Sequence, residues 1–212
     1  MGSQAPIPPL YPITDTEISG LSHAEQVKRL VAGGATLIQL REKRMSAGRF
    51  YEAAQLAVAI GREHGARILI NDRVDVCLAL GADGVHLGQD DLHPVEARRL
   101  LGQRAVIGYS THNLDQALQA LVFPIDYLAI GPIFSTTSKE KPDPEVGLEG
   151  IRSVKAVVGS IPLVAIGGIT EVLAPKVREA GADSVAMISG VLVPSRQLTL
   201  RTQQLLQVLS AA

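Results

Sequence analysis

The stretch Thr36–Lys43, with the sequence TLIQLREK, is an apolar run that ends in polar and charged residues. Its first half is typical of a buried strand. Because strand side chains alternate between faces, Gln39, Arg41 and Lys43 are expected to point the same way. An amide, a guanidinium and an ammonium group would then line one wall. Arg binds phosphate oxygens in pairs and Lys adds a point charge, so the strand is predicted to end at a phosphate-binding site.

Similar short apolar runs alternate with helical patterns along all 212 residues, and we count eight of each. The expected strands are Leu10–Ile13, Leu37–Leu40, Ile68–Ile70, Gly84–Leu87, Val106–Tyr109, Tyr127–Ile130, Leu163–Ile166 and Ser184–Ile188. Continuous apolar runs are typical of parallel strands that are covered on both faces. The α/β pattern therefore predicts a (β/α)8 TIM barrel as one compact domain over residues 10–212, preceded by a flexible N-terminal arm, residues 1–9.

An open doubly wound sheet is the alternative fold, but no glycine-rich fingerprint follows the first strand. The helical periodicity is clearest in three apolar stripes: Phe50, Ala53, Ala54, Ala57 and Ile60; Leu114, Ala117, Leu118 and Leu121; and Leu148, Ile151, Val154 and Val158. Ser22 and Glu25 form a predicted capping box before the first helix.

The composition narrows the function classes. The net charge is −1 and 19% of the residues are charged, which gives no basic excess for nucleic acid or a membrane surface. No apolar run is long enough to span a bilayer. The single cysteine, Cys77, rules out an intrachain disulfide and fits a cytoplasmic location.

Polar residues follow the expected strands at the end where a barrel carries its chemistry. Asp72 and Asp91 follow neighbouring strands, close to Arg41 and Lys43. Two carboxylates beside cations suit a Mg²⁺ ion shared with a phosphate ligand. The alternative is that each aspartate caps the helix after it.

Two further segments indicate phosphate binding. Small residues at Gly167-Gly168 and Ser189-Gly190 follow the last two strands, where barrels commonly bind phosphate. The hydroxyl-rich loop Thr136-Thr137-Ser138-Lys139 is long for such a barrel, which favours a functional loop. His112 follows Ser110 by two residues and is either a proton shuttle or a satisfied polar group.

The residues therefore predict two phosphorylated small-molecule ligands. Arg41, Lys43 and Lys139 supply three positive charges, and Asp72 with Asp91 offsets one divalent cation. This sum matches a diphosphate ester, which carries about three negative charges near neutral pH.

Eight motifs, in this order along the chain, resemble the thiamine-phosphate synthase family, also called thiamine-phosphate pyrophosphorylases. They cover residues 11–209 and are Gln39–Lys43, Asn71–Asp75, Gly84–Asp91, Gly108–His112, Gly131–Phe134, Thr136–Lys139, Ile166–Ile169 and Met187–Ser189. The resemblance implies a transferase of thiamine biosynthesis that joins a pyrimidine methyl diphosphate to a thiazole phosphate. Thiamine phosphate and pyrophosphate are the implied products, and a homodimer is expected from the family alone.

The resemblance also implies residue roles. The pyrimidine diphosphate is expected to contact eight residues: Gln39, Leu40, Arg41, Glu42, Lys43, Asn71, Ser110 and Lys139. Four of these are the expected catalytic residues: Arg41, Lys43, Ser110 and Lys139. Glu42 lies on the opposite face of the alternation and should matter least. The implied metal is Mg²⁺ on Asp72 and Asp91. The thiazole phosphate is expected at Thr136, Thr137, Ser138, Gly168, Ile188 and Ser189.

Three alternatives stay open at this point. A thiazole tautomerase resembles this family, would use His112 and would need no metal. A non-catalytic protein that binds thiamine phosphates would not need the acidic pair. A sugar-phosphate epimerase would need acid and base groups placed to abstract a proton from carbon.

Overall fold

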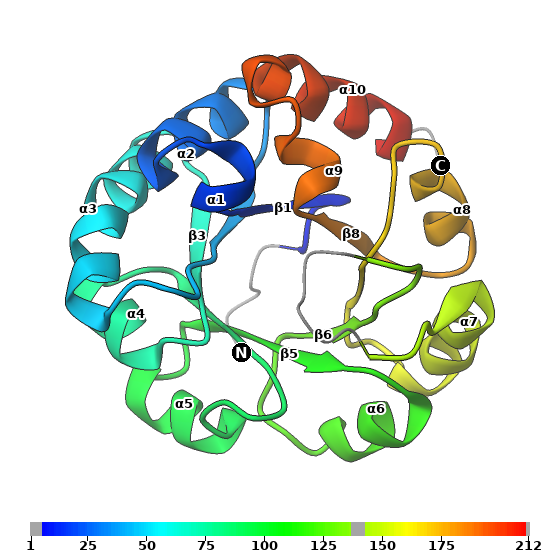
Figure 1. The fold of residues 1–212 in the computed structure, drawn as a ribbon. Helices are drawn as coiled ribbons and strands as arrows, with labels where there is room; N and C mark the ends of the chain where they lie inside the picture. Colours follow the sequence, from blue (N-terminus) through cyan, green and yellow to red (C-terminus); the bar gives the residue numbers. More distant parts are fainter. Residues whose placement is uncertain (1–5, 137–142, 211–212) are drawn as a thin grey trace.

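The structure is a computed structural model that describes residues 6–136 and 143–210. Eight parallel strands pair in chain order, and β1 also pairs with β8, so the sheet closes into a barrel (Figure 1). The strands are β1 (Leu10–Thr14), β2 (Leu37–Leu40), β3 (Arg67–Asn71), β4 (Gly84–Leu87), β5 (Val106–Thr111), β6 (Tyr127–Ile130), β7 (Leu163–Ile166) and β8 (Ser184–Met187). The predicted (β/α)8 barrel is confirmed, and the doubly wound alternative is excluded.

The strand predictions were closest where an apolar run is bounded by turn residues. The bounds of β2, β4, β6 and β7 agree with the sequence expectation, whereas β5 continues to Thr111.

Before β1, the carbonyl of Pro6 accepts a hydrogen bond from Arg67 Nη2 (2.7 Å). The carbonyl of Pro9 accepts another from the Val185 amide (2.9 Å). The flexibility of the arm stays a prediction.

Helices surround the barrel as an outer ring (Figure 1). They are α2 (His23–Ala32), α3 (Ala47–Glu63), α4 (Val74–Leu80), α5 (Pro94–Leu101), α6 (Leu114–Ala120), α7 (Gly147–Val158), α8 (Ala174–Glu179) and α10 (Leu198–Ser210). The expected count of eight was too low for the described residues. Two four-residue helices, α1 (Thr16–Ser19) and α9 (Ser189–Leu192), follow β1 and β8, and a 3-10 turn, η1 (Ser195–Gln197), precedes α10. Within the described residues, no helix has the length and apolar character to cross a membrane.

Local signals explain where several helices begin. The Ser22 side chain accepts a hydrogen bond from the Glu25 amide (3.2 Å), so the Ser22 half of the predicted capping box is confirmed. The Glu25 carboxylate accepts instead from Arg29 Nε (2.7 Å). The Asp15 side chain accepts from the amides of Glu17 and Ile18, both at 3.0 Å, and so begins α1 directly after β1. This cap brings α1 close to α9 inside the outer ring (Figure 1).

The core has two layers. The larger one lies between the barrel and the helices and contains the predicted stripe of α7 and, except for Ala53, that of α3. The stripe on α6 was partly wrong: Leu114 and Leu118 are exposed, and the buried residues are alanines. Alanine lets this short helix approach the strands, so its larger side chains turn to solvent. The smaller layer fills the barrel and contains Tyr11, Ile13, Leu37, Leu69, Val106, Tyr127, Ala129, Val164 and Ala186.

A buried histidine of α2, His23, lies against a contact between the first two strands. Thr14 Oγ1 donates to the Gln39 carbonyl (3.3 Å) and lies within hydrogen-bond distance of His23 Nδ1 (2.8 Å). His23 is 1% exposed, and its Nε2 lies 3.8 Å from Glu42 Oε2 with no hydrogen-bond partner in the described part of the chain. Burial lowers the pKa of His23, against the opposing effects of Glu42 and Asp15.

We predict that this histidine makes stability fall in acid. Its pKa is lower in the folded than in the unfolded chain, so its contribution is complete above the unfolded value of about 6.5 and is lost as the pH falls through the folded value. The free energy of unfolding should therefore drop less in His23→Asn than in the wild type between about pH 7.5 and pH 5. Urea titrations at each pH measure the unfolding free energy of both proteins. An equal change of this free energy with pH in the two proteins would contradict the prediction.

The tightest contact between strands predicts a second stability effect. A Cβ atom on Gly84 would lie 1.9 Å from the carbonyl oxygen of Val106, whereas one on Gly48 would meet nothing within 4 Å. Gly84→Ala should cost at least about 2 kcal/mol of unfolding free energy because backbone must move. The same substitution at Gly48, in the first turn of α3, should change it by no more than about 1 kcal/mol. Chemical denaturation of both variants tests the pair, and similar losses would count against the packing argument.

Candidate active site

The carboxyl ends of the strands open into a cleft of about 1360 Å³. Twelve residues predicted from the sequence line it: Gln39, Arg41, Glu42, Lys43, Asn71, Asp72, Asp91, Ser110, Thr136, Gly168, Ile188 and Ser189. Leu40 was expected to contact the pyrimidine diphosphate, but the residue is fully buried in the core and is not among those that line the cleft. Three predicted residues, Thr137, Ser138 and Lys139, lie outside the described residues.

The guanidinium of Arg41 is held by an acid that sequence reasoning missed. Arg41 Nη1 donates to Asp15 Oδ2, and both side chains are largely buried. The other oxygen of Asp15 caps α1, while the Asp15 amide donates to Gln26 Oε1 (3.0 Å). The signal in the sequence was an acidic residue directly after the first strand. Arg41 is therefore fixed toward the cleft before any ligand arrives.

Lys43 and the two predicted metal ligands meet across three consecutive β–α units. Lys43 Nζ donates to Asp72 Oδ2, and the Asp72 and Asp91 carboxyl groups lie close enough to share a hydrogen bond. Asp72 has φ 60°, the only positive φ of a non-glycine residue in the described part of the chain. Only a few residue types adopt this left-handed conformation readily, and aspartate is one of them.

The capping alternative for the two aspartates is wrong. The residue that precedes α4 is Arg73, and the residue that precedes α5 is His93, whose Nδ1 accepts from the Val95 amide (3.3 Å). Asp91 instead accepts from the Gly88 amide (2.7 Å) within its own loop. Neither aspartate caps the helix that follows it.

The electrostatics of this pair fit a divalent cation. Burial raises the pKa of Asp91, and the neighbouring Asp72 carboxyl raises it further, while the Gly88 amide lowers it. Two carboxylates held close together repel each other, and a cation between them would relieve that repulsion. No group of three or more acidic, His or Cys ligands occurs among the described residues. Mg²⁺ needs no such group, because it prefers a few carboxylates with phosphate oxygens and water.

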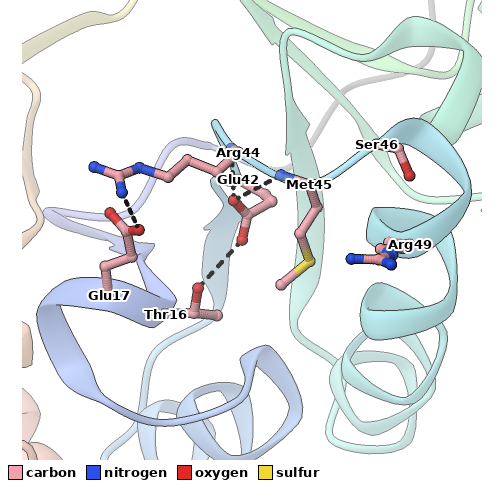
Figure 2. A pocket seen from close by; sticks show the side chains of 7 residues that line it. All are labelled: Thr16, Glu17, Glu42, Arg44, Met45, Ser46 and Arg49. Carbon is pink, nitrogen blue, oxygen red and sulfur yellow. Dashed lines mark hydrogen bonds and ion pairs between the residues drawn. The ribbon is translucent and has the colours of Figure 1, made fainter.

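Glu42 faces away from this charge cluster. Figure 2 shows its carboxylate turned toward α1, where it accepts hydrogen bonds from Thr16 Oγ1 (3.2 Å) and the amides of Arg44 (2.8 Å) and Met45 (3.3 Å). Arg44 pairs with Glu17 beside it (3.0 Å). The alternation read from the sequence thus holds past the end of β2, and Glu42 stabilises the loop that carries Lys43.

Two neutral polar residues, Asn71 and Ser110, also line the cleft. Asn71 is 7% exposed, and its Nδ2 has no hydrogen-bond partner among the described residues. Such a buried donor is costly unless a ligand satisfies it. Ser110 Oγ lies 2.8 Å from His86 Nε2, and its carbonyl accepts from Gln89 Nε2 (2.5 Å). Both residues have polar atoms to offer a ligand in the cleft.

The expected phosphate site after β7 has a packing role as well. A Cβ atom on Gly167 would lie 2.6 Å from Pro132, and one on Gly168 would lie 2.4 Å from the Ser135 carbonyl. Both glycines also have positive φ. They let this loop approach the loop after β6, which carries Thr136. Ile188 and Ser189 line the cleft at the start of α9.

His112 also lines the cleft, as the alternation from Ser110 predicted. Its Nδ1 donates to the Gly131 carbonyl (2.5 Å) and lies 3.5 Å from Asp143 Oδ2. These contacts hold the ring in place.

Comparisons with known proteins agree with this geometry. The sequence profile of a family described as "Thiamine monophosphate synthase" matches residues 10–191. A thiamine-phosphate synthase of Chloroflexus aurantiacus is 45% identical over 202 residues, 95% of this chain and 92% of that protein. One from Koribacter versatilis is 46% identical over 217 residues, 99% of each chain.

Solved structures give the same result. The thiamine phosphate pyrophosphorylase from Pyrococcus furiosus superposes with a TM-score of 0.85 at 36% identity and covers 95% of both chains. A barrel titled "Native KDPGal structure" has a TM-score of 0.65 at 19% identity and shares the fold alone. The cleft, its charge cluster and these relatives lead to one conclusion: the chain belongs to the thiamine monophosphate synthase family of transferases.

Proposed function

We propose that this chain joins a pyrimidine methyl diphosphate to a thiazole phosphate, forming thiamine phosphate and pyrophosphate. The observation that carries the proposal is the cluster of Arg41, Lys43, Asp72 and Asp91 on one side of the cleft. Two cations beside two carboxylates suit a diphosphate that shares a divalent cation with the protein. The names of the relatives support the same reaction.

The pyrimidine diphosphate is proposed to bind along the β2–β3 side of the cleft. Arg41 and Lys43 would bind the diphosphate, helped by Lys139. The unsatisfied Nδ2 of Asn71 would donate to it, and Gln39 and Ser110 would contact the pyrimidine. Asp72 and Asp91 would hold Mg²⁺, which supplies charge neutralisation for the leaving group when it is bound.

The thiazole phosphate is proposed to bind on the opposite side. Thr136, Thr137 and Ser138 would offer hydroxyl groups from the loop after β6. Gly168, Ile188 and Ser189 would offer backbone and hydroxyl groups after β7 and β8, where barrels of this class commonly bind phosphate.

The chemistry requires a good leaving group and two aligned substrates. The bond between the methylene carbon and the diphosphate oxygen breaks, and its electron pair leaves with pyrophosphate. The thiazole nitrogen supplies the electron pair of the new carbon–nitrogen bond. Arg41 and Lys43 stabilise the charge that develops on the departing oxygen, and the cleft holds the nitrogen near the carbon. The electron-rich aminopyrimidine spreads the positive charge left on carbon, so the carbon–oxygen bond can break first.

The direct test mixes the purified protein with both substrates and Mg²⁺ and follows thiamine phosphate and pyrophosphate together. Equal amounts of the two products are expected, with a loss of at least about hundredfold in rate when a chelator removes the metal. Thiamine phosphate formed without any response to the chelator would overturn the metal proposal. No product at all would favour the isomerase that uses His112 or a non-catalytic binding protein.

A control separates metal binding from folding. Asp91→Asn keeps the size of the side chain and an acceptor for the Gly88 amide, and it removes the charge. Its activity should need much more Mg²⁺ while its unfolding midpoint stays near that of the wild type. A wild-type response to Mg²⁺ would exclude Asp91 as a ligand.

Adjacent residues of the loop after β2 offer a matched pair. Arg41→Gln removes a cation aimed at the cleft and should lower kcat/KM at least about hundredfold. Glu42→Gln keeps an oxygen acceptor for the loop amides. It should lower kcat/KM no more than about threefold, which is the size of effect expected when one weak neutral hydrogen bond is lost. Steady-state kinetics of both variants measure the contrast. A greater loss in Glu42→Gln would mean that the assignment of faces is wrong.

A further inference from the structure

A continuous chain of hydrogen bonds crosses the interior of the barrel and joins two of the residues that line the cleft. Gln39 Nε2 donates to Tyr11 Oη (2.9 Å), and Tyr11 Oη lies 3.0 Å from Tyr127 Oη. Tyr127 Oη lies 2.8 Å from His86 Nδ1, and His86 Nε2 lies 2.8 Å from Ser110 Oγ. Four strands, β1, β2, β4 and β6, thus connect the Gln39 amide with the Ser110 hydroxyl on β5.

This chain of hydrogen bonds is buried and closely packed. Tyr11, Tyr127 and Gln39 are each at most 1% exposed, and His86 is 9% exposed. The His86 ring stacks on Tyr127, with ring centroids 5.6 Å apart and planes 17° apart. A Cβ atom on Gly108 would lie 2.0 Å from Tyr127 Cζ, so glycine is required beside this ring. Such packing fixes where each hydroxyl group can point.

Counting protons gives the chain a direction. The Gln39 amide nitrogen can only donate, so Tyr11 Oη accepts and has one proton of its own to donate. If Tyr11 donates this proton to Tyr127 Oη, then Tyr127 donates its own proton to His86 Nδ1. A ring that accepts at Nδ1 is neutral and has its proton on Nε2, which faces Ser110. In the reverse order, Tyr11 Oη would accept from both Gln39 and Tyr127, and its own proton would have no acceptor among the described residues. A buried unsatisfied donor costs about 1–3 kcal/mol, which favours the first order.

Both tyrosines keep their protons, as this order requires. Burial raises the pKa of Tyr11 and of Tyr127 well above the ordinary value for a phenol.

We propose that Tyr11, Tyr127 and His86 are positioning residues that hold Ser110 as a hydrogen-bond donor toward the cleft. His86 Nε2–H donates to Ser110 Oγ, so the Ser110 hydroxyl proton is free to point at a ligand acceptor. The chain also fixes the Gln39 amide, which presents its nitrogen to Tyr11. The relevance to catalysis rests on the proposed function, in which Gln39 and Ser110 contact the pyrimidine, whereas the direction of the chain is a property of the protein without substrate.

The first experiment reads the tautomer of His86 in the substrate-free wild type by nitrogen-15 NMR of the imidazole rings. The signal is assigned as the one that is lost in His86→Gln or in His86→Asn. A proton on Nε2 with a bare Nδ1 is expected. A proton on Nδ1 would overturn the proposal whether or not the protein makes thiamine phosphate. If the tautomer is as expected but no thiamine phosphate forms, the proposed function fails and the direction of the chain stands.

The second experiment breaks the chain without removing a ring. Tyr127→Phe should give a mixture of His86 tautomers and lower kcat/KM about tenfold, or about 1.4 kcal/mol. It should also lower the unfolding midpoint, because the buried Tyr11 hydroxyl loses its acceptor. Tyr109→Phe is the control, since Tyr109 is buried on the neighbouring strand β5 but is not part of the chain of hydrogen bonds. It should leave the tautomer and kcat/KM unchanged. An unchanged tautomer in Tyr127→Phe, or equal kinetic losses in the two variants, would overturn the proposal.

A pair of His86 variants adds a rescue test. The amide nitrogen of His86→Gln reaches the place of Nε2 and can donate to Ser110. That of His86→Asn reaches only the place of Nδ1. His86→Gln should therefore keep at least about tenfold more activity than His86→Asn, the difference made by one hydrogen bond. Equal activity in the two variants would show that the donor to Ser110 is not what matters.

Discussion

The pairing of β1 with β8 is the constraint on which this molecule depends. Once the sheet is closed, no strand edge is left open, and every carboxyl end lies at the same mouth. Residues far apart in sequence, such as Arg41, Asp91 and Ser189, then line one cleft. The same closure leaves an interior that side chains fill, and here that filling includes two tyrosines as well as aliphatic residues.

Two cations of the cleft are already paired with carboxylates. Arg41 is held by Asp15 and Lys43 by Asp72, which lowers the cost of ordering these two side chains when a phosphate arrives. The two pairs differ in exposure, since the Lys43 side chain is 51% exposed and that of Arg41 only 16%. Arg41 is thus the more rigid anchor, and Lys43 has more freedom to follow a ligand.

Periodicity predicted most of the fold, because parallel strands covered on both faces are apolar throughout and are bounded by turns. It could not predict α1 or α9, since a four-residue helix has no full apolar period. Strand alternation placed Gln39, Arg41 and Lys43 on one face and Glu42 on the other. It could not find the Arg41–Asp15 pair or the Tyr11–Tyr127–His86 chain, because such contacts depend on three-dimensional neighbours.

The left-handed backbone at Asp72 has a consequence for any mutational study of the cleft. A residue with a Cβ atom and no local hydrogen-bonding side chain strains a φ of 60°, so alanine at this position alters the backbone as well as the charge. Asparagine and glycine tolerate the same conformation. An alanine scan would therefore overstate the importance of the Asp72 carboxylate. Asparagine at this position measures the effect of the charge alone, and glycine measures the effect of the whole side chain.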